Sequence, residues 1–345
     1  MSNYSKKLSY SLSIKLNNML DEMPAFIKTF FTGIDASTSI KTRIAYAIDI
    51  KTFLSYLISE SMLKGRSSIM DITLKDIDEL DSTCIERYLA YLSYYEKDNM
   101  SFSNSNSAKA RKLSSIRSMY KYFYKKSLIS HNPSVLVDMP KKKQKPIIRM
   151  EDTESAALLD NIEYGASLTK TQMKYHEKTS ERDLAIITLF LGTGIRISEL
   201  VGLDIADIDF SANSFRITRK GGNEEILYFG DEAKEALIKY YDVRKKIIPY
   251  LGSENAFFLS LQKKRMQVSS VQKMLKKYIH ISVPLKNISP HKLRSTFGTN
   301  LYQQTGDIYL VAEVLGHKDV NTTKKYYAAA SEEARKYAAK QVKIR

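Results

Sequence analysis

Apolar residues recur every three or four positions through the first part of the chain, between residues 20 and 138. This spacing is typical of amphipathic helices that bury one face. Residues 38–60 show it with four side chains expected on the buried face: Ile44, Ile48, Phe53 and Leu57. Residues 81–95 repeat the pattern, and residues 105–129 add a helix that begins after a Ser/Asn-rich turn. The pattern predicts an all-helical first domain.

The second half of the chain predicts more helices and one β-hairpin. Residues 181–194 are an apolar run closed by glycine, as at the end of a buried helix. Residues 214–229 alternate around a Gly-Gly turn, which favours two antiparallel strands. Residues 231–246 begin acidic and end basic, while residues 289–306 and 307–316 both end in glycine. We therefore expect a mainly α fold with a small antiparallel β-sheet.

A lysine-rich segment separates the two halves. Pro140 and Pro146 bracket four lysines, and both proline and repelling like charges disfavour a compact helix. The segment is either a solvated loop or a linker that follows a phosphate backbone, and the two interpretations are compatible. We expect three parts: a helical domain at 1–138, a basic linker at 139–150 and a second domain at 151–345.

Charge narrows the choice of partner. Hydrophobic residues make up 43% of the 345 residues, enough for real cores, and the formal net charge is +16. Such an excess favours a polyanion such as nucleic acid, although a merely soluble basic protein is the alternative. The helix expected at 105–129 carries cations around its apolar face, which suits either a DNA groove or solvent: Lys109, Arg111, Lys112, Arg117 and Lys121.

Several classes of site are missing from the sequence. Phosphate-binding loops, dinucleotide-binding glycine motifs and zinc-ligand spacing are not found, so we expect no cofactor and no metal. The single cysteine, Cys84, is expected to be a packing residue rather than a nucleophile. We find neither a signal peptide pattern nor an apolar run of membrane-spanning length, so we expect a cytoplasmic protein.

The second half holds a basic set that suits metal-free phosphoryl transfer. Two arginines can fork onto phosphate oxygens, a lysine can protonate a leaving oxygen, and a tyrosine can attack phosphorus. Nearby cations favour the phenolate, whose ordinary pKa is about 10. Each residue taken alone could have a purely structural role, such as an ion pair between Arg196 and Glu199. The set in its order along the chain is Arg196, Lys220, His291, Arg294, His317 and Tyr326.

With these residues in place, the chain resembles the tyrosine recombinases, especially the bacterial Xer recombinases and related integrases. "GTGIRISELVGL" matches the first-arginine motif, which gives Arg196 its role and Glu199 a supporting one. "RKGGNEE" carries the lysine, Lys220, and "HKLRSTFGTNL" matches the His-x-x-Arg motif. "LGHKDVNTTKKYY" matches the Leu-Gly-His motif. By resemblance the His-x-x-Arg motif assigns catalytic roles to His291 and Arg294. The Leu-Gly-His motif assigns one to His317, and the nucleophile nine residues later is Tyr326, whose neighbour is Tyr327.

The resemblance implies a fold and a mechanism. The first domain would be a helical, SAM-like core-binding domain, and the second a catalytic domain with a C-terminal helix exchanged between protomers. A homotetramer on two double-stranded DNA sites would cleave and rejoin DNA through a 3′-phosphotyrosine and a Holliday junction. The resemblance is compatible with a need for a second recombinase or an accessory protein. It is also compatible with two biological roles, resolution of chromosome dimers and integration or excision of a mobile element.

Two features qualify the match. Many relatives carry a further basic residue after the lysine turn, where this chain has Glu224 and Glu225. Ser295 stands where Xer relatives often have histidine. The competing functions are a type IB topoisomerase, which relaxes DNA as a monomer, and a non-enzymatic DNA-binding regulator.

Overall fold

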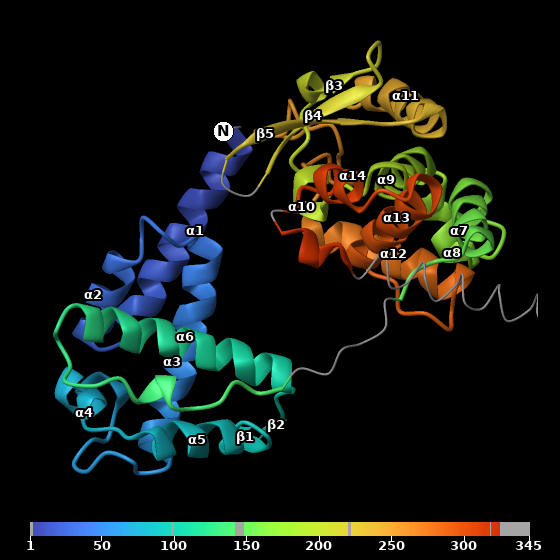
Figure 1. Cartoon of the computed structure of the whole chain (residues 1–345). Helices are drawn as coiled ribbons and strands as arrows, with labels where there is room; N and C mark the ends of the chain where they lie inside the picture. Colours follow the sequence, from blue (N-terminus) through green and yellow to red (C-terminus); the bar gives the residue numbers. More distant parts are fainter. Residues whose placement is uncertain (1–2, 98–99, 142–147, 220–221, 318, 325–345) are drawn as a thin grey trace, which may run out of the picture. The chain divides into compact units, whose positions relative to one another are not determined.

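The computed structural model describes residues 3–97, 100–141, 148–219, 222–317 and 319–324. It divides into two compact units, residues 2–144 and 145–345, and each is described by itself. Helices dominate both units, and the β-strands form two small antiparallel sheets (Figure 1). The mainly α fold expected from the sequence is confirmed.

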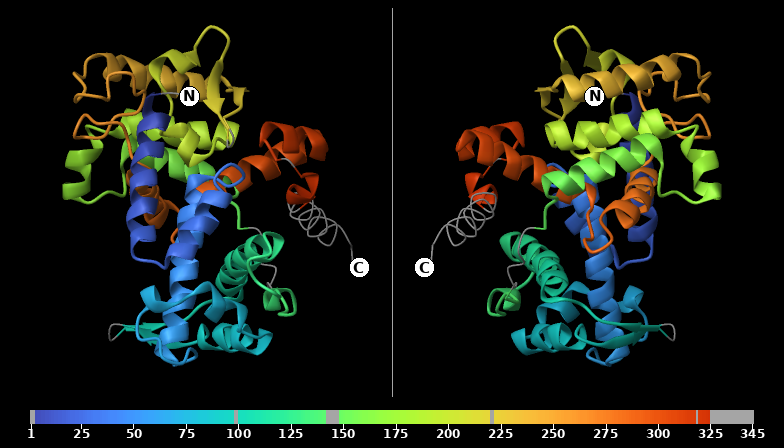
Figure 2. Two further views of the ribbon diagram at one scale, coloured as in Figure 1. Left: turned by 90° about the vertical axis from the view of Figure 1, so that its left-hand side faces the viewer. Right: turned by 90° about the vertical axis from the view of Figure 1, so that its right-hand side faces the viewer.

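The first unit is a cluster of helices with one short hairpin. Its long helices α1 and α3 pack against each other, and α6 packs on α3 (Figures 1 and 2). The elements are α1 (Asn3–Asp21), α2 (Ala25–Gly33), α3 (Ile40–Ser59), η1 (Ile69–Asp71), α4 (Leu74–Asp78), α5 (Ser82–Tyr91), β1 (Tyr95–Lys97), β2 (Met100–Phe102), α6 (Asn106–Lys125) and η2 (Pro133–Val135).

Side-chain caps fix where the three helices expected from the sequence begin. Ser39 and Ser105 accept hydrogen bonds from backbone N–H groups at the first turns of α3 and α6. Asp81 accepts one from the Cys84 N–H, at 2.8 Å, at the start of α5. Each cap satisfies a backbone donor that lacks a partner inside its helix. Cys84 is buried, as expected for a packing residue.

The expected buried face of α3 was wrong at one position. Ile48 is 47% exposed, whereas Ile50 and Leu54 are fully buried. With 3.6 residues per turn, residues two apart point to nearly opposite sides of a helix, so Ile48 and Ile50 cannot share a buried face. The spacing of apolar residues indicated a helix, but it did not show which of them meet the core.

The second unit surrounds the buried helix α9, which packs against α7, α11 and α13. Strands β3, β4 and β5 form an antiparallel sheet in that order, with Phe215 opposite Leu227. The elements are α7 (Asp152–Tyr164), α8 (Lys170–His176), α9 (Ser180–Thr193), α10 (Ile197–Leu200), η3 (Ile205–Asp207), β3 (Ile208–Asp209), β4 (Ser214–Thr218), β5 (Glu224–Tyr228), α11 (Asp231–Lys245), α12 (Val268–Ser282), α13 (Pro290–Thr305), α14 (Ile308–Val314) and η4 (Val320–Thr322).

The expected helices of this half correspond to α9, α11, α13 and α14, and the expected hairpin is β4–β5. The sequence analysis did not identify α7, α8, α10, α12 or β3 in this unit, nor α1, α2 and α4 in the first. The first unit was expected to be all-helical, and the β1–β2 hairpin shows that this was wrong. No helix in the part of the chain that the structure describes is both long and apolar enough to cross a membrane.

Candidate active site

Arg196 and Glu199 lie where α9 ends and α10 begins. Gly194 ends α9 with φ at 60°, and a Cβ there would stand 2.5 Å from the Phe297 ring, so both conformation and space require glycine. The sharp turn makes Arg196 the residue before α10. Its backbone N–H donates to Glu199 Oε2 at 3.0 Å and its Nη1 to Oε1 at 2.9 Å. The carboxylate thus fixes both ends of this arginine.

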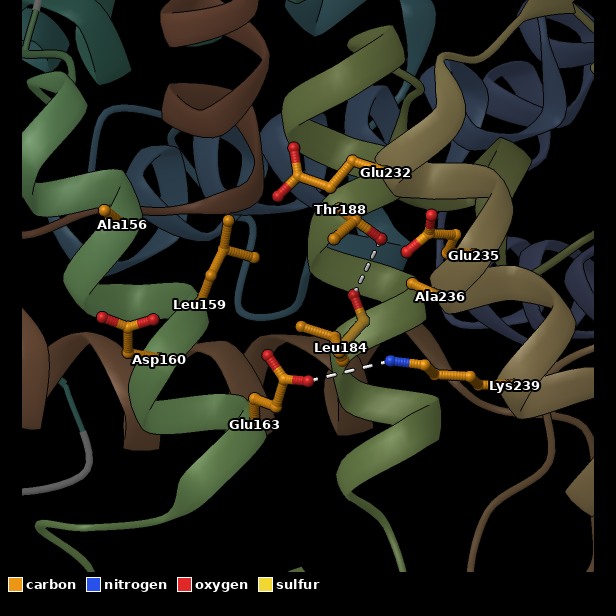
Figure 3. Close-up of a pocket in the computed structure, with 10 residues that line it drawn as sticks. All are labelled: Ala156, Leu159, Asp160, Glu163, Leu184, Thr188, Glu232, Glu235, Ala236 and Lys239. Carbon is orange, nitrogen blue, oxygen red and sulfur yellow. Dashed lines mark hydrogen bonds and ion pairs between the residues drawn. The ribbon is translucent and has the colours of Figure 1, made fainter.

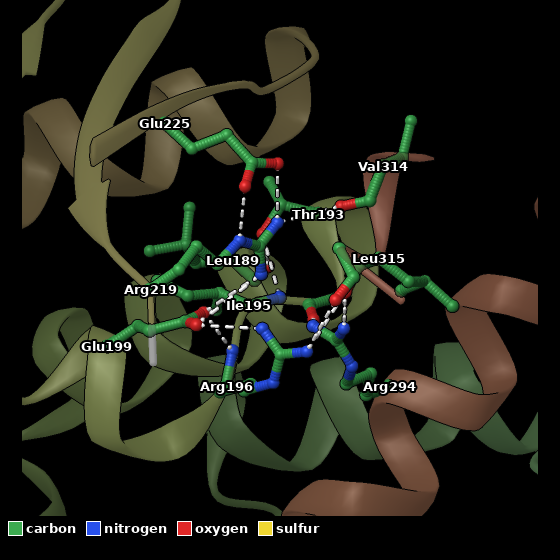
Figure 4. A network of polar contacts seen from close by, with 12 residues as sticks. Leu189, Thr193, Ile195, Arg196, Glu199, Arg219, Glu225, Arg294, Val314 and Leu315 are labelled. Atoms are coloured by element: carbon green, nitrogen blue, oxygen red, sulfur yellow. Dashed lines mark hydrogen bonds and ion pairs between the residues drawn. The ribbon is translucent and has the colours of Figure 1, made fainter. Parts of the chain in front are cut away.

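Arg294 lies on α13 with its side chain aimed at the same place. It is 3% exposed, and its guanidinium donates to the carbonyls of Gly194 and Leu315. The Arg196 Nη2 donates to the carbonyls of Leu315 and Gly316, each at 3.2 Å. The two guanidiniums therefore meet at the Leu315 carbonyl, although 98 residues separate them in sequence (Figure 4).

The two histidines approach this point from different elements. His317 follows Gly316 directly, and its Nδ1 lies 3.1 Å from the Oγ1 of Thr323, a fully buried side chain. His291 sits in the first turn of α13, one turn before Arg294, and is exposed. The loop after α14 thus places His317 directly after the Gly316 carbonyl that accepts from Arg196, and His291 shares helix α13 with Arg294.

A third arginine, Arg219, lies at the end of β4 and belongs to the same network (Figure 4). It forms a two-point ion pair with Glu225, at 2.6 and 2.8 Å, and approaches Glu199 at 3.4 Å. The sequence analysis did not single out Arg219, and it noted Glu225 only as a departure from relatives. The opposite charges six residues apart across a hairpin were the signal that could have suggested this pair.

The charges of this network do not cancel. Three guanidiniums, from Arg196, Arg219 and Arg294, face two carboxylates, from Glu199 and Glu225, which leaves one net positive charge. The pKa of Glu225 is held below its usual value, first by its hydrogen bonds to Arg219 and further by the charges of Arg196 and Arg294. The charged form of Glu225 is therefore favoured, and with three guanidiniums against two carboxylates the site still favours an anion.

Two members of the expected set, Lys220 and Tyr326, lie outside the described residues, as do Tyr327 and the segment expected to form an exchanged helix. The structure brings together Arg196, Glu199 and Arg294. The two arginines share the Leu315 carbonyl, and His317 follows two residues later in the chain. Ser295 donates from its hydroxyl to the His291 carbonyl within α13, at 3.1 Å.

A surface pocket of the same unit offers the opposite electrostatics. It lies between α7, α9 and α11, and its only cation is Lys239, which lies 3.8 Å from Glu163 (Figure 3). Its other charged lining residues are Asp160, Glu232 and Glu235. Carboxylates repel phosphate, so this pocket does not suit the chemistry. The described residues contain no group of three or more His, Cys, Asp or Glu side chains arranged to hold a metal.

The arrangement can stabilise charge on a phosphate. Carbonyl oxygens orient a guanidinium through its N–H groups but carry only partial charge. The Leu315 carbonyl therefore fixes both arginines without offsetting their charge, and Glu199 is a carboxylate partner of Arg196 at 2.9 Å. Such preorganised donors are the usual means of stabilising a phosphorane-like transition state without metal. The geometry suits a site that binds a phosphate through arginine side chains held on a helical scaffold.

The chain belongs to the phage integrase family, whose sequence profile matches residues 149–333. It is a tyrosine site-specific recombinase of the Xer type, and the family and function expected from its motifs are confirmed. It is 33% identical to tyrosine recombinase XerC of Caldanaerobacter subterraneus over 93% of this chain and 86% of that protein. It is 29% identical to tyrosine recombinase XerS of Streptococcus mutans over 92% of this chain and 96% of that protein.

Solved structures share the fold at lower identity. The XerH site-specific recombinase in a post-cleavage complex with palindromic difH substrate is 18% identical and superposes with a TM-score of 0.69, over 96% of this chain and 88% of that one. A λ integrase dimer bound to a core site is 16% identical, with a TM-score of 0.60 over 90% and 94% of the two chains. At these identities the comparison supports the fold of both units.

Proposed function

We propose that the chain cleaves double-stranded DNA at a specific site through Tyr326. The phenol oxygen forms a bond to phosphorus while the bond to the 5′-oxygen breaks, which leaves a 3′-phosphotyrosine. Lys220 gives its proton to the departing 5′-oxygen. A 5′-hydroxyl from the partner duplex then attacks the phosphotyrosine and releases the phenol. Because the phosphodiester energy is kept in the covalent link, religation needs no ATP.

The remaining residues of the proposed set hold the phosphate. Arg196 and Arg294 fork onto its non-bridging oxygens, and His291 and His317 donate or accept protons at the same group. Glu199 orients Arg196 through the hydrogen bonds at 2.9 and 3.0 Å. The observation that carries the proposal is the meeting of both guanidiniums at the Leu315 carbonyl, two residues before His317.

The assembly belongs to the proposal as well. The helical unit of residues 2–144 contacts DNA as the core-binding domain, and the segment 139–150 links it to the catalytic unit along the phosphate backbone. Four copies assemble on two DNA sites, pass through a Holliday junction and are coupled by the C-terminal helix. The fold shared with XerH bound to difH and with a λ integrase tetramer bound to a Holliday junction supports this arrangement.

A covalent trapping experiment tests the nucleophile. The protein selects its binding site from fragmented host DNA, and that site is resynthesised with a nick placed at each position in turn. At the right position the short 5′-fragment diffuses away and the covalent adduct accumulates. We expect the wild type and Tyr327→Phe to form the adduct and Tyr326→Phe to form none, as read on a denaturing gel.

The neighbouring tyrosine is the matched control. If Tyr327→Phe abolishes the adduct and Tyr326→Phe retains it, the nucleophile is wrongly assigned. A wild-type protein that binds its selected site but never forms an adduct would instead contradict the whole catalytic set.

A further inference from the structure

Arg219 is the described residue immediately before Lys220, and its side chain is almost fully buried. Only 8% of that side chain is exposed, which is unusual for an arginine at the end of a surface hairpin. A buried guanidinium is stable only when carboxylates or carbonyls satisfy its donors. The identity of those partners shows what the residue fixes.

The Arg219 side chain joins three separate elements. Its Nε and Nη2 donate to the Glu225 carboxylate on β5, and its Nη1 lies 3.4 Å from both oxygens of Glu199 on α10. Its Nη2 also donates to the Val314 carbonyl of α14 at 3.0 Å. One side chain therefore ties the turn end of the hairpin to the two elements that carry Arg196 and lead to His317.

The backbone of Arg219 closes the same hairpin. Its N–H donates to the Asn223 carbonyl at 2.7 Å, and its carbonyl accepts from the Gly222 N–H at 3.1 Å. These bonds bracket the Gly-Gly turn. Arg219 is thus held at both its main chain and its side chain, directly before the turn begins.

The glycine of the Leu-Gly-His motif makes room for this arginine. A Cβ at Gly316 would lie 2.9 Å from both Cζ and Nε of Arg219, and Gly316 has φ at 57°. A larger residue would therefore be strained and would also push the guanidinium aside. The position of the Arg219 guanidinium therefore depends on the glycine in the loop that carries His317.

Electrostatics keep the Arg219 links intact across the neutral pH range. Burial alone would lower the pKa of Arg219, but the hydrogen bonds and charges of Glu225 and Glu199 outweigh it and raise that pKa above its usual value. The pKa of Glu225 is lowered in turn, chiefly by Arg219. Both shifts favour the charged forms of Arg219 and Glu225.

We propose that Arg219 is a positioning residue that anchors hairpin β4–β5 to α10 and α14, so that the general acid next to it in the chain reaches the leaving 5′-oxygen. The inference rests on the proposed role of Lys220 as that acid. Glu225, which departs from the basic residue of many relatives, then serves as the counterion that holds Arg219 in place rather than as a DNA contact.

A substrate whose cleavage needs no general acid tests whether Arg219 acts by positioning Lys220. The protein's selected, nicked duplex is made in two forms, with an ordinary phosphodiester or a 5′-bridging phosphorothiolate at the cleaved bond. A thiolate leaves without protonation, because thiol pKa values lie near 8.5 whereas alcohol values lie far higher. We expect Lys220→Ala to slow oxygen cleavage about 10²- to 10⁴-fold and to recover most of the rate with sulfur.

For Arg219→Ala and Arg219→Lys, we expect oxygen cleavage to fall about 10²-fold, the size of effect that a misplaced catalytic group produces, and sulfur cleavage to fall less than about tenfold. The ratio of the two rates is independent of the fraction of folded protein, so partial unfolding cannot imitate the result. Arg216→Ala is the matched control, because Arg216 lies on the same strand with its side chain 54% exposed and pairs with Asp207. It should leave both rates near wild type.

Equal losses on both substrates in the Arg219 variants, together with sulfur rescue of Lys220→Ala, would overturn the positioning role and leave the proposed function standing. Absence of rescue in Lys220→Ala would remove Lys220 as the acid, and the inference would fall with it. The two failures are therefore seen in different variants.

Discussion

Both units bury cations beside a carboxylate, but they do so to different ends. In the first unit Asp49 is fully buried and accepts hydrogen bonds from Arg111, Lys112 and Ser115, with Lys112 only 6% exposed. Here a single carboxylate attracts two cations from α6 to α3. In the second unit Arg196 and Arg294 both donate to one backbone carbonyl, and Arg196 also pairs with Glu199.

The comparison shows two ways of holding cations: a carboxylate alone at Asp49, and carboxylates together with backbone carbonyls around Arg196 and Arg294. A carboxylate offsets the charge of a buried cation, and this favours a fixed contact between two helices. A carbonyl dipole orients a guanidinium but leaves its charge available to an anion. Two of the basic residues of α6 that suited a DNA groove in the sequence bind Asp49: Lys112, which is buried, and Arg111, whose side chain is 49% exposed.

Removing the Asp49 carboxylate should have the largest effect. Asp49→Ala leaves the Lys112 ammonium buried without its counterion, so we expect the first unit to lose about 3–5 kcal/mol of its free energy of unfolding. Thermal unfolding of the full chain measures it. Asp21→Ala is the control, because the Asp21–Lys28 pair is largely exposed and should contribute at most about 1 kcal/mol. Equal, small losses in both variants would contradict the structural role of Asp49.

Removing Arg294 should affect chemistry more than stability. Arg294→Ala takes away a preorganised guanidinium, so we expect adduct formation to slow about 10²- to 10³-fold. The adduct assay on the nicked duplex measures the rate. Lys292→Ala, a change on the same helix at a side chain that donates only to the Asn287 carbonyl among described contacts, should stay within a few-fold of wild type. A fully active Arg294→Ala enzyme would rule out the proposed phosphate contact.

The smallest effect concerns pH and the Glu225 carboxylate. Its pKa is lowered in the folded protein, so its ion pair stabilises the fold above the unfolded-state pKa and is lost as pH falls through the lower folded-state value. We expect Glu225→Gln to melt about 2–4 °C below wild type at pH 7, the shift that about 1 kcal/mol gives in a domain of this size. Below about pH 5 the gap should narrow.

Scanning calorimetry from pH 7 down to acid checks this dependence. Glu224→Gln is the neighbouring control, because Glu224 lies on the same strand, is exposed and forms no ion pair among the described residues. A gap between wild type and Glu225→Gln that widens in acid would show that the sign is wrong.

Local pattern alone predicted the elements whose boundaries depend on neighbours in sequence. Ser39, Asp81 and Ser105 cap helices within three residues of themselves, and Gly194 ends α9 where its left-handed conformation was needed. Helix α12 went unidentified even though its apolar residues meet the core, because no cap or turn marker of its own drew attention to it. Helix α8 was missed although Thr169 and Gln172 form a capping box at its start, and the exposure of Ile48 depends on the helices around α3.

The sequence by itself determined the family, the mainly helical fold and the order of the chemical side chains, because each motif is a short local signature. Only the tertiary structure decided that Arg196 and Arg294, far apart along the chain, share the Leu315 carbonyl. It also decided that Arg219, unremarkable in a string of basic residues, lies buried between Glu199 and Glu225. Charge pairing over such distances depends on how α10, α13, α14 and the hairpin pack, and no local pattern encodes that packing.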